Sequence, residues 1–477
     1  MLLHPLVVDL DGTLVNTDML HESALKVLRN SPLDTFRIPF WLSKGKAALK
    51  QSLALRADLN PQSLPYNLEL LEWLKQQKSS GRKLILCTAS DVSIATPIAN
   101  HLGIFDEVLA SDGASNLIGK RKAEALEQRF GRAGFDYVGN SKADLAVWER
   151  ARQAIIANAS DRLIHQTEKL CKIEHVFPRK KPGFNTWWRV FRAHQWMKNV
   201  LLFVPLLAAH QLTNLEAWFT LALAFMSFSL CASSVYITND LLDLESDRLH
   251  PRKRGRPFAS GQVPAWLGVV LAPLLLISSA ALGVYISKSF FFWLAFYFIL
   301  TSVYSWLLKR LILVDCLALA MLYTLRIVAG AAVVNMDVSF WLLAFSVFLF
   351  LSLAFVKRYA ELNTKLLNDS EKIHGRGYYA SDAPLIQMLG VGSGYASIIV
   401  LTLYLNSDAV LKLYRTPEFI WGTVPIMLFW ISWMWIQAHR GNMHDDPLVF
   451  AVKDKASLLS GAAFAAVVGI GAWGWPW

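Results

Sequence analysis

The sequence has few cysteines, no leader-like start and no soluble basic region. Its four cysteines show neither a paired spacing nor a metal motif, so we expect no disulfide framework and no cysteine metal site. The first apolar run, Leu6 to Leu10, ends in acidic residues almost at once, and we therefore expect no signal peptide. The lack of a soluble basic domain argues against nucleic acid as a partner.

Apolar and aromatic residues are abundant instead. Hydrophobic residues make up 54% of the 477 residues, and the mean hydropathy is +0.35, which is high for a soluble protein. The chain has 18 tryptophans, a residue that often gathers at membrane interfaces. Its net charge of +11 suits loops that face anionic lipid, and it also suits a substrate rich in phosphate. A lipid bilayer is the first expected partner.

The composition changes near residue 185, and a chain of this length holds more than one domain. Before that point, charged residues alternate with short apolar runs, as in an α/β domain. After it come long apolar runs. We predict a soluble domain over residues 1–177, a basic linker and interfacial helix over 178–195, and an all-helical membrane domain over 196–477.

The soluble part is predicted to form a doubly wound α/β sheet. Short buried runs with helical segments between them predict strands near residues 6–10, 84–89, 107–110, 136–139 and 153–157. Residues 15–80 are predicted to form a small helical cap.

Two acids follow the first of these strands. Asp9 and Asp11 stand in the string DLDGT, and two carboxylates on one loop suit a nucleophile and a proton donor. They are expected at the carboxyl end of a strand. The string resembles motif I of the haloacid dehalogenase (HAD) phosphatase superfamily.

Later segments resemble the other HAD motifs in the same order. Thr88 ends a buried strand, Lys122 lies where a helix begins, and Asp144 follows a strand; Lys120 is a rival to Lys122. Asn140 stands where the family often has Asp, which leaves Asp144 as the acidic ligand.

The HAD resemblance implies an Mg²⁺-dependent phosphatase in which Asp9 attacks phosphorus and Asp11 protonates the leaving oxygen. Thr88 and Lys122 would hold the phosphate, with Mg²⁺ on Asp9, the Asp11 carbonyl and Asp144. The alternatives are an inactive scaffold and a phosphatase for an unrelated phosphate ester.

A second group of acids follows a long apolar run. Asn239, Asp243 and Asp247 are spaced i, i+4, i+8, which places them on one face of a helix, with Asp240 beside them. Oxygen ligands of this kind hold Mg²⁺. The basic residues that follow, suited to a pyrophosphate, include Arg248, Lys253 and Arg256. A solvated charged loop is the alternative, but such an arrangement at a bilayer edge is costly.

This segment resembles the first signature of the UbiA superfamily of intramembrane prenyltransferases. The longer string from Asn239 to Gly261 resembles one branch, the polyprenyl-phosphate phosphoribosyltransferases, and the resemblance runs from about Arg192 to the C-terminus. It implies that Mg²⁺ and nearby cations bind phosphoribosyl pyrophosphate, and that a polyprenyl phosphate takes the 5-phosphoribosyl group.

The second polar loop is basic where the general UbiA pattern carries acids. It contains Lys357, Arg358, Glu361 and Arg376, which resembles the phosphoribosyl branch and suits the 5-phosphate of the donor. Two other functions stay open. One is transfer of a prenyl group from its diphosphate to an aromatic acceptor, and the other is a non-catalytic lipid-binding or transport protein.

Nine apolar runs are long enough to be considered as membrane spans. They cover residues 196–210, 217–238, 264–286, 290–308, 314–334, 339–356, 384–405, 418–437 and 457–475. Lys and Arg gather after every second run, which predicts a multi-pass protein of the inner, cytoplasmic membrane with its N-terminal domain in the cytoplasm. The C-terminus is then expected outside.

Three further polar positions carry open alternatives. Lys198 is predicted to reach the active cavity or to contact lipid headgroups. Arg326, within a span, is predicted to line the cavity or to pair with Asp315. The loop over residues 439–455 either closes the cytoplasmic mouth or caps helix ends.

The fusion itself suggests a second reaction. A HAD domain tethered beside the transferase would meet the 5-phosphate of the product at high effective concentration. We therefore predict that it hydrolyses this phosphate. No pattern in the sequence specifies the oligomeric state.

Overall fold

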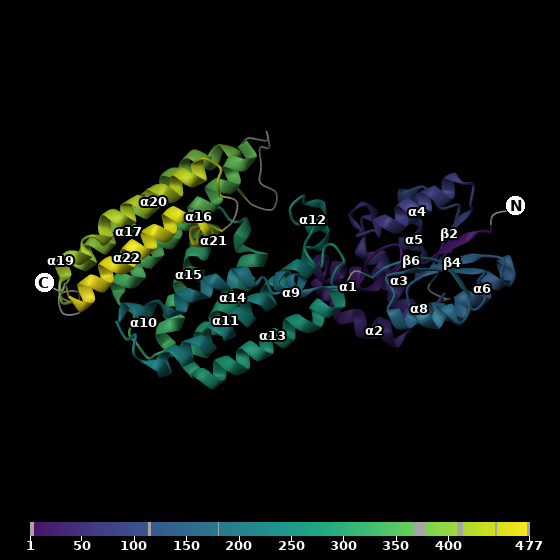
Figure 1. The fold of residues 1–477 in the computed structure, drawn as a ribbon, viewed down its shortest axis with the longest axis horizontal. Coiled ribbons are helices and arrows are strands. Elements are labelled where there is room, and N and C mark those ends of the chain that lie inside the picture. Colours follow the sequence, from purple (N-terminus) through teal and green to yellow (C-terminus); the bar gives the residue numbers. More distant parts are fainter. Residues whose placement is uncertain are drawn as a thin grey trace. The chain divides into compact units, whose positions relative to one another are not determined.

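The computed structural model describes residues 4–112, 116–179, 181–366, 377–407, 414–443 and 446–474 (Figure 1). The chain divides into two compact units. One contains Met1–Phe191 and Tyr236–Ala272, and the other contains Arg192–Val235 and Pro273–Trp477. The segment Tyr236–Ala272, which begins at the end of the second predicted span, therefore packs with the N-terminal residues.

The first unit is built on a six-stranded parallel sheet with the strand order β3-β2-β1-β4-β5-β6. The five predicted strands are confirmed, and a sixth lies at the edge. Its residues are mostly polar and exposed, so they lack the apolar run that marks the inner strands. The strands are β1 Leu6–Val8, β2 Leu84–Asp91, β3 Glu107–Ser111, β4 Asp136–Gly139, β5 Gln153–Ala157 and β6 Lys172–Phe177.

Helices cover both faces of this sheet. Because successive side chains of a strand point to opposite faces, Leu6 and Val8 of β1 enter one apolar core and Val7 enters another. Figure 1 shows α4 and α5 on one side of the sheet and α6 and α8 on the other. These helices, with the short α7, are α4 Leu68–Ser79, α5 Val92–Leu102, α6 Lys120–Phe130, α7 Leu145–Trp148 and α8 Asp161–Glu168.

A small helical cap with its own apolar core is inserted after β1, as predicted. It is shorter than the predicted residues 15–80, because α4 packs on the sheet instead. Asp18 caps its first helix by accepting a hydrogen bond from the backbone N–H of Leu20. Trp41 and Leu53 lie in the core of the cap. Its helices are α1 Met19–Asn30, α2 Ile38–Ser43 and α3 Lys46–Ala57, with the 3-10 helices η1 Pro32–Arg37 and η2 Pro61–Ser63.

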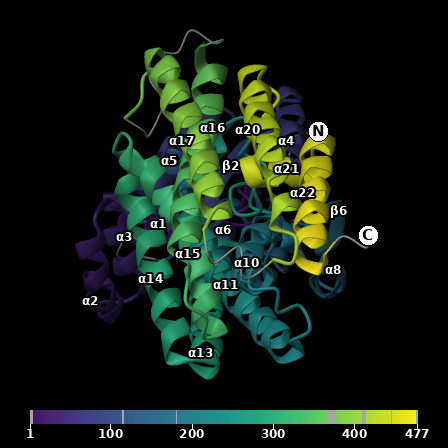
Figure 2. The same ribbon diagram turned by 90° about the vertical axis from the view of Figure 1, so that its left-hand side faces the viewer.

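Eight helices among the described residues are long and apolar enough to cross a membrane, and they match eight of the nine predicted runs. In Figure 2, α16, α17, α20 and α22 run side by side, and each packs against the next in this order. The eight are α11 Leu215–Leu242, α13 Ala265–Ile286, α14 Lys288–Trp306, α15 Val314–Val333, α16 Phe340–Leu366, α17 Ala383–Leu405, α20 Thr423–His439 and α22 Lys455–Trp473.

The remaining predicted run, residues 196–210, is not a spanning α-helix. It forms the 3-10 helix η4, Ala193–Phe203, followed by the short α10, Val204–Ala208. A 3-10 helix rises about 2.0 Å per residue and an α-helix 1.5 Å. Together the two segments rise about 30 Å, close to the thickness of the hydrocarbon core. Because a 3-10 helix rises more per residue, these sixteen residues cover a distance for which an α-helix needs about twenty.

Candidate active sites

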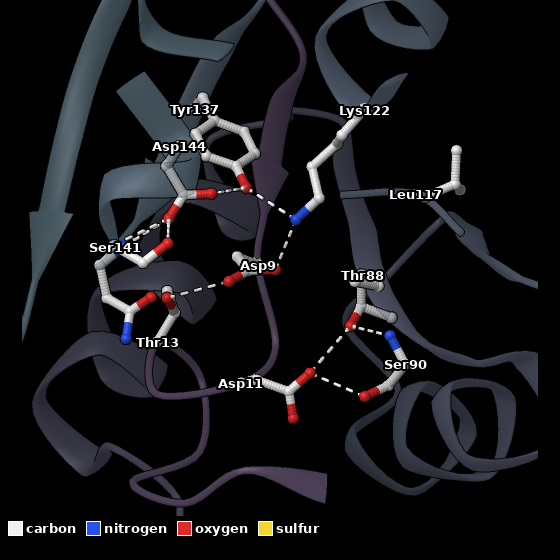
Figure 3. A network of polar contacts seen from close by, with 12 residues as sticks. Asp9, Asp11, Thr13, Thr88, Ser90, Leu117, Lys122, Tyr137, Ser141 and Asp144 are labelled. Carbon is white, nitrogen blue, oxygen red and sulfur yellow. Dashed lines mark hydrogen bonds and ion pairs between the residues drawn. The ribbon is translucent and has the colours of Figure 1, made fainter. Parts of the chain in front are cut away.

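The first candidate site lies at the carboxyl end of β1. Lys122 Nζ on α6 lies 2.7 Å from Asp9 Oδ1 and donates to Tyr137 Oη at 3.0 Å. Tyr137 Oη in turn donates to Asp144 Oδ1 at 2.8 Å. Figure 3 shows this chain of contacts from Asp9 to Asp144. The four side chains come from β1, α6, β4 and the turn after β4, so the parallel sheet brings them together.

Asp11 is held separately by hydroxyl groups at the end of β2. Ser90 Oγ donates to Asp11 Oδ2 at 2.7 Å, and Thr88 Oγ1 donates to the same oxygen at 3.4 Å. The other oxygen, Oδ1, accepts the backbone N–H of Met19, the first residue of α1, at 2.7 Å. Asp11 therefore points into the site from a fixed position (Figure 3).

Asp144 is oriented by the turn in which it stands. Its Oδ2 accepts hydrogen bonds from the backbone N–H of Asn140 and from the N–H and hydroxyl of Ser141. Asn140 also lies against the motif I loop. At Gly12, where φ is +71°, an added Cβ would lie 2.1 Å from Asn140 Nδ2. Both the backbone conformation and the close approach therefore require glycine.

Burial and charge shift the pKa values of the two acids on the loop. Burial raises the pKa of Asp9 to about 7, the carboxylates of Asp144 and Asp11 add to the increase, and Lys122 opposes it. Burial also raises the pKa of Asp11, with a contribution from Asp18. The single ammonium group of Lys122 therefore faces more carboxylate charge than it neutralises.

The donor set of this site fits Mg²⁺. Two carboxylates, Asp9 and Asp144, and the backbone carbonyl of Asp11 are oxygen ligands of the kind that Mg²⁺ prefers. Among the residues that the structure describes, no three His, Cys, Asp or Glu side chains form a metal-binding group. Such a site would therefore depend on the carbonyl and on water.

A pocket of about 380 Å³ opens over these residues. His21 and Lys50 of the cap line it, as does Trp266 near the start of α13. Lys50 Nζ donates to the carbonyl of Ala89 at 2.8 Å, next to Ser90. The pocket therefore holds the ammonium group of Lys50 together with the acids, which suits a phosphate ester.

The second group, Asn239 to Asp247, lies on two helices rather than one. The helix α11 ends at Leu242, and the short α12, Leu244–Leu249, begins after Asp243. The backbone N–H of Asp243 still donates to Asn239 O, and that of Asp247 donates to Asp243 O, both at 2.9 Å. The predicted i, i+4, i+8 relation is therefore kept in the hydrogen bonds across the break.

The predicted pyrophosphate cations contact acids of this same segment. Arg256 Nη1 donates to Asp240 Oδ1 at 3.0 Å and to Asp247 Oδ2 at 2.5 Å. Lys253 Nζ lies 3.9 Å from Asp247 Oδ1. Arg248 is engaged elsewhere, since its guanidinium donates to Glu22 on α1 and to the carbonyl of Ala259.

A third polar cluster lies inside the membrane-type unit and centres on Asp446. Lys198 Nζ of η4 lies 2.7 Å from Asp446 Oδ2, and Lys357 Nζ of α16 lies 3.4 Å from the same oxygen. Tyr323 Oη of α15 donates to both carboxylate oxygens, at 2.9 and 3.0 Å. Asp446 also caps α21, Pro447–Lys453. The lysines keep the pKa of Asp446 well below its usual range, although burial opposes this.

Lys198 is therefore buried in a polar cluster and does not extend to lipid headgroups. Arg326, one turn along α15 from Tyr323, donates to Asn199 Oδ1 at 2.9 Å and to Tyr297 Oη at 3.0 Å. The predicted alternative of an Arg326–Asp315 pair is wrong. The two residues are eleven positions apart on one helix, which separates them by about 16 Å along its axis.

Asp315 pairs instead with Arg358. Arg358 Nη2 lies 2.5 Å from Asp315 Oδ2, and Nη1 contacts Glu361. Tyr378 Oη donates to Asp315 at 2.6 Å. Arg358 is fully buried in this group, so the predicted substrate contact of Arg358 would require its partners to move. Arg376 lies outside the described residues.

Four residues of these clusters were given no role from the sequence. They are Ser90 and Tyr137 in the first site, and Tyr297 and Tyr323 in the membrane-type unit. Serine and tyrosine are too common to mark a site by themselves. Asn199 and Asp446 did stand in motifs that the sequence analysis noted, beside Lys198 and within the loop 439–455.

Two family profiles match different parts of the chain. The profile of the UbiA prenyltransferase family matches residues 200–450, about half of the chain. The chain belongs to the UbiA prenyltransferase family. The profile of the haloacid dehalogenase-like hydrolases matches residues 6–149, the part that carries the first site.

Relatives of this UbiA-family chain differ in how much of it they share. The uncharacterized protein y4nM of Sinorhizobium fredii is 37% identical over 97% of this chain and 90% of its own length. The nodulation protein NoeC of Azorhizobium caulinodans is 36% identical over 58% of this chain and 91% of its own length. The decaprenyl-phosphate phosphoribosyltransferase of Mycobacterium tuberculosis is 35% identical over 37% of this chain and 59% of its own length.

Proposed function

We propose that this UbiA-family protein transfers 5-phosphoribose from phosphoribosyl pyrophosphate to a polyprenyl phosphate in the membrane. The products would be polyprenyl-phosphoryl-5-phosphoribose and pyrophosphate. We propose further that the HAD-like part then hydrolyses the 5-phosphate. The similarity to decaprenyl-phosphate phosphoribosyltransferases supports the substrate pair.

The observation that carries the first step is the cationic cluster around Asp446. Lys357 lies on α16, which continues through the first part of the predicted polar loop, in the segment where the general UbiA pattern places acids. Its ammonium group joins that of Lys198 on one carboxylate. Arg326 of the same unit donates hydrogen bonds to the neutral groups Asn199 Oδ1 and Tyr297 Oη. A group of cationic side chains of this kind suits an anionic substrate group. The same group of cations suits a second metal ion less well.

In the transfer, a phosphate oxygen of the lipid attacks C1 of the ribose. The bond from C1 to the pyrophosphate oxygen breaks, and the pyrophosphate leaves with its electron pair. Asn239, Asp243 and Asp247 would hold Mg²⁺, which neutralises charge on the leaving group. Arg256 and Lys253, already beside these acids, would add hydrogen bonds to the same oxygens.

In the hydrolysis, the Asp9 carboxylate attacks phosphorus and the bond to the ribose oxygen breaks. Asp11 gives its proton to that oxygen, for which the raised pKa of this buried acid is suited. Water then releases inorganic phosphate from the aspartyl-phosphate. Thr88 and Lys122 would bind the phosphate oxygens, and Asp9 and Asp144 would hold Mg²⁺, which would offset the charge of the phosphate.

We further propose an inner-membrane protein with the HAD-like part in the cytoplasm. The contact between Glu22 and Arg248 requires residues 22 and 248 to lie on one side of the membrane. The chain must then cross an even number of times between them. Since α11 is one crossing, η4 with α10 would be the other. Dense Lys and Arg over residues 248–256 favour the cytoplasmic side.

The test of the transfer uses purified full-length protein, Mg²⁺, ribose-labelled phosphoribosyl pyrophosphate and polyprenyl phosphate. We expect the label to enter the lipid phase, and Asp243→Asn to reduce this by at least about 100-fold while thermal unfolding is unchanged. Label that stays in the aqueous phase, together with prenylation of an added aromatic acceptor from polyprenyl diphosphate, would replace the proposal with the aromatic prenyltransferase function. An active Asp243→Asn variant would refute the metal role.

A further inference from the structure

The cap helix α1 carries a stripe of three charged residues, one acidic and two basic, that faces the segment at the end of α11. Glu22, Lys26 and Arg29 are spaced i, i+4, i+7 and therefore share one face of α1. Their partners are, in order, Arg248, Glu245 and Asp243. The partner numbers fall as the helix numbers rise, so the two segments run antiparallel. All six residues belong to the same compact unit.

The first pair is the most buried. Arg248 Nη2 and Nη1 donate to the two oxygens of Glu22 at 2.7 and 3.1 Å, and the side chains are only 8% and 5% exposed. Arg248 Nε also donates to Ala259 O at 2.8 Å. A two-pronged guanidinium–carboxylate contact fixes orientation as well as distance. This pair therefore holds the far end of α12.

The other two pairs act on the break between α11 and α12. Lys26 contacts the carboxylate of Glu245. Arg29 Nη1 donates to the carbonyl of Leu242 at 3.0 Å, and Arg29 Nη2 lies 3.4 Å from Asp243 Oδ1. Leu242 is the last residue of α11, where a cation satisfies a terminal carbonyl and interacts favourably with the helix dipole. Arg29 thus contacts both sides of the break.

The same helix also begins at the first candidate site. The N–H of Met19 donates to Asp11 at 2.7 Å. Glu22 accepts a hydrogen bond from Thr17 Oγ1 at 2.7 Å, and the carbonyl of Thr17 accepts the N–H of Gly12. One helix of twelve residues therefore joins the motif I loop to the segment that carries Asp243 and Asp247.

We propose that α1 is a positioning element for the transferase. Its charge stripe fixes the break at Asp243 and the rotation of α12, and thereby sets where Asp243 and Asp247 point. The HAD-like part would then be needed for the first reaction as a scaffold, in addition to its own chemistry. This inference rests on the proposed transfer, in which these two acids bind the donor.

The stripe makes a charge-swap test possible. We expect Lys26→Glu, which sets two carboxylates against each other, to reduce kcat/KM for phosphoribosyl pyrophosphate by about five- to tenfold. The effect should fall mainly on KM for the donor and on the Mg²⁺ concentration needed for half activity. The double variant Lys26→Glu/Glu245→Lys restores the pair with its signs exchanged. We expect it to recover most of the loss.

Two controls separate this effect from general damage. Lys46→Glu makes the same charge change at an exposed position on α3 of the cap, away from the stripe, and should leave the transfer unchanged. Thermal unfolding of each variant checks that it folds.

The outcomes are distinguishable. If the wild type does not label lipid, the proposed transfer fails before the stripe is tested. If the wild type is active and Lys26→Glu matches it, α1 has no positioning role. If Lys26→Glu is impaired but the swap does not recover, the loss comes from Lys26 alone and the pairing is refuted. Recovery in the swap supports the proposal.

Discussion

At Asp9, burial and neighbouring charge act on one carboxylate in opposite directions. Burial raises its pKa to about 7, the carboxylates of Asp144 and Asp11 add to the increase, and Lys122 opposes it. A nucleophile must be ionised at the pH of the cell. Lys122 is therefore the side chain of this chain that keeps Asp9 usable, in addition to any contact that it makes with phosphate.

Replacing Lys122 with Met should remove the proposed phosphatase activity. We expect hydrolysis of ribose 5-phosphate or p-nitrophenyl phosphate to fall by at least about 100-fold, because a buried charge that stabilises the reacting group is lost. The measurement is release of inorganic phosphate by the full-length protein at saturating Mg²⁺.

Lys120→Met is the matched control. Lys120 is two residues away at the start of the same helix and is exposed, so we expect activity within about twofold of the wild type. Equal losses in the two variants would show that Asp9 does not depend on its contact with Lys122.

Lys122 and Lys120 also show how far the sequence alone predicts the residues of the site. Motif spacing predicted Asp9, Asp11, Thr88 and Asp144 at one sheet edge, because parallel strands end together. It could not decide between Lys122 and Lys120, since both fit the motif and only the rotation of α6 separates them. Ser90 and Tyr137 were not predictable. Their roles depend on which face of β2 and β4 they occupy beside the loop.

Among the secondary-structure elements, the apolar patterns predicted the strands and the long, regular helices. Five of the six strands, and the eight long apolar helices of the described residues, were expected from runs of apolar residues. The break in α11 at Asp243 was not predicted, because the i, i+4 spacing continues through it and Arg29, which contacts the break, is more than 200 positions away. The 3-10 winding of η4 was also not predicted, because it depends on packing against helices that are distant in the sequence.

A glycine on α15 shows how tightly η4 packs. An added Cβ at Gly330 would lie 2.0 Å from the carbonyl oxygen of Leu202 on η4. We therefore expect Gly330→Ala to lower the stability of the membrane-type unit by about 1–3 kcal/mol. It should also impair the transfer, because Lys198 and Asn199 are on the same segment. Thermal unfolding in detergent measures the first effect and lipid labelling the second.

Gly392→Ala gives the comparison. Gly392 lies within α17, and an added Cβ there meets nothing within 4 Å. Alanine in a helix interior is favoured by roughly 0.5–1 kcal/mol over glycine, so this variant should be as stable as the wild type or more stable. If Gly330→Ala were equally harmless, the close approach of η4 to α15 would be wrong.

For the whole molecule, the number of membrane crossings decides where each end lies. If η4 with α10 crosses the membrane, the eight long helices bring the total to nine. An odd total places the two ends of the chain on opposite sides. We therefore expect a C-terminal alkaline phosphatase fusion to be active in the periplasm, and an N-terminal fusion of the same enzyme to be inactive.

The same fusions made with green fluorescent protein should give the inverse result, with fluorescence only at the N-terminus. Two ends on one side would mean that η4 and α10 do not cross. The contact of Glu22 with Arg248 would then have to be abandoned, because it requires an even number of crossings between them.

The fusion of the two parts is explained if the UbiA-family part makes the phosphate ester that the HAD-like part hydrolyses. The most direct test is the mass of the lipid product. Full-length wild type and Asp9→Asn are each given phosphoribosyl pyrophosphate, polyprenyl phosphate and Mg²⁺, and their lipids are compared. We predict polyprenyl-phosphoryl-ribose from the wild type and the 5-phosphorylated lipid from Asp9→Asn, in similar total amounts. A 5-phosphate retained equally by both, or no ribosylated lipid from either, would contradict the account.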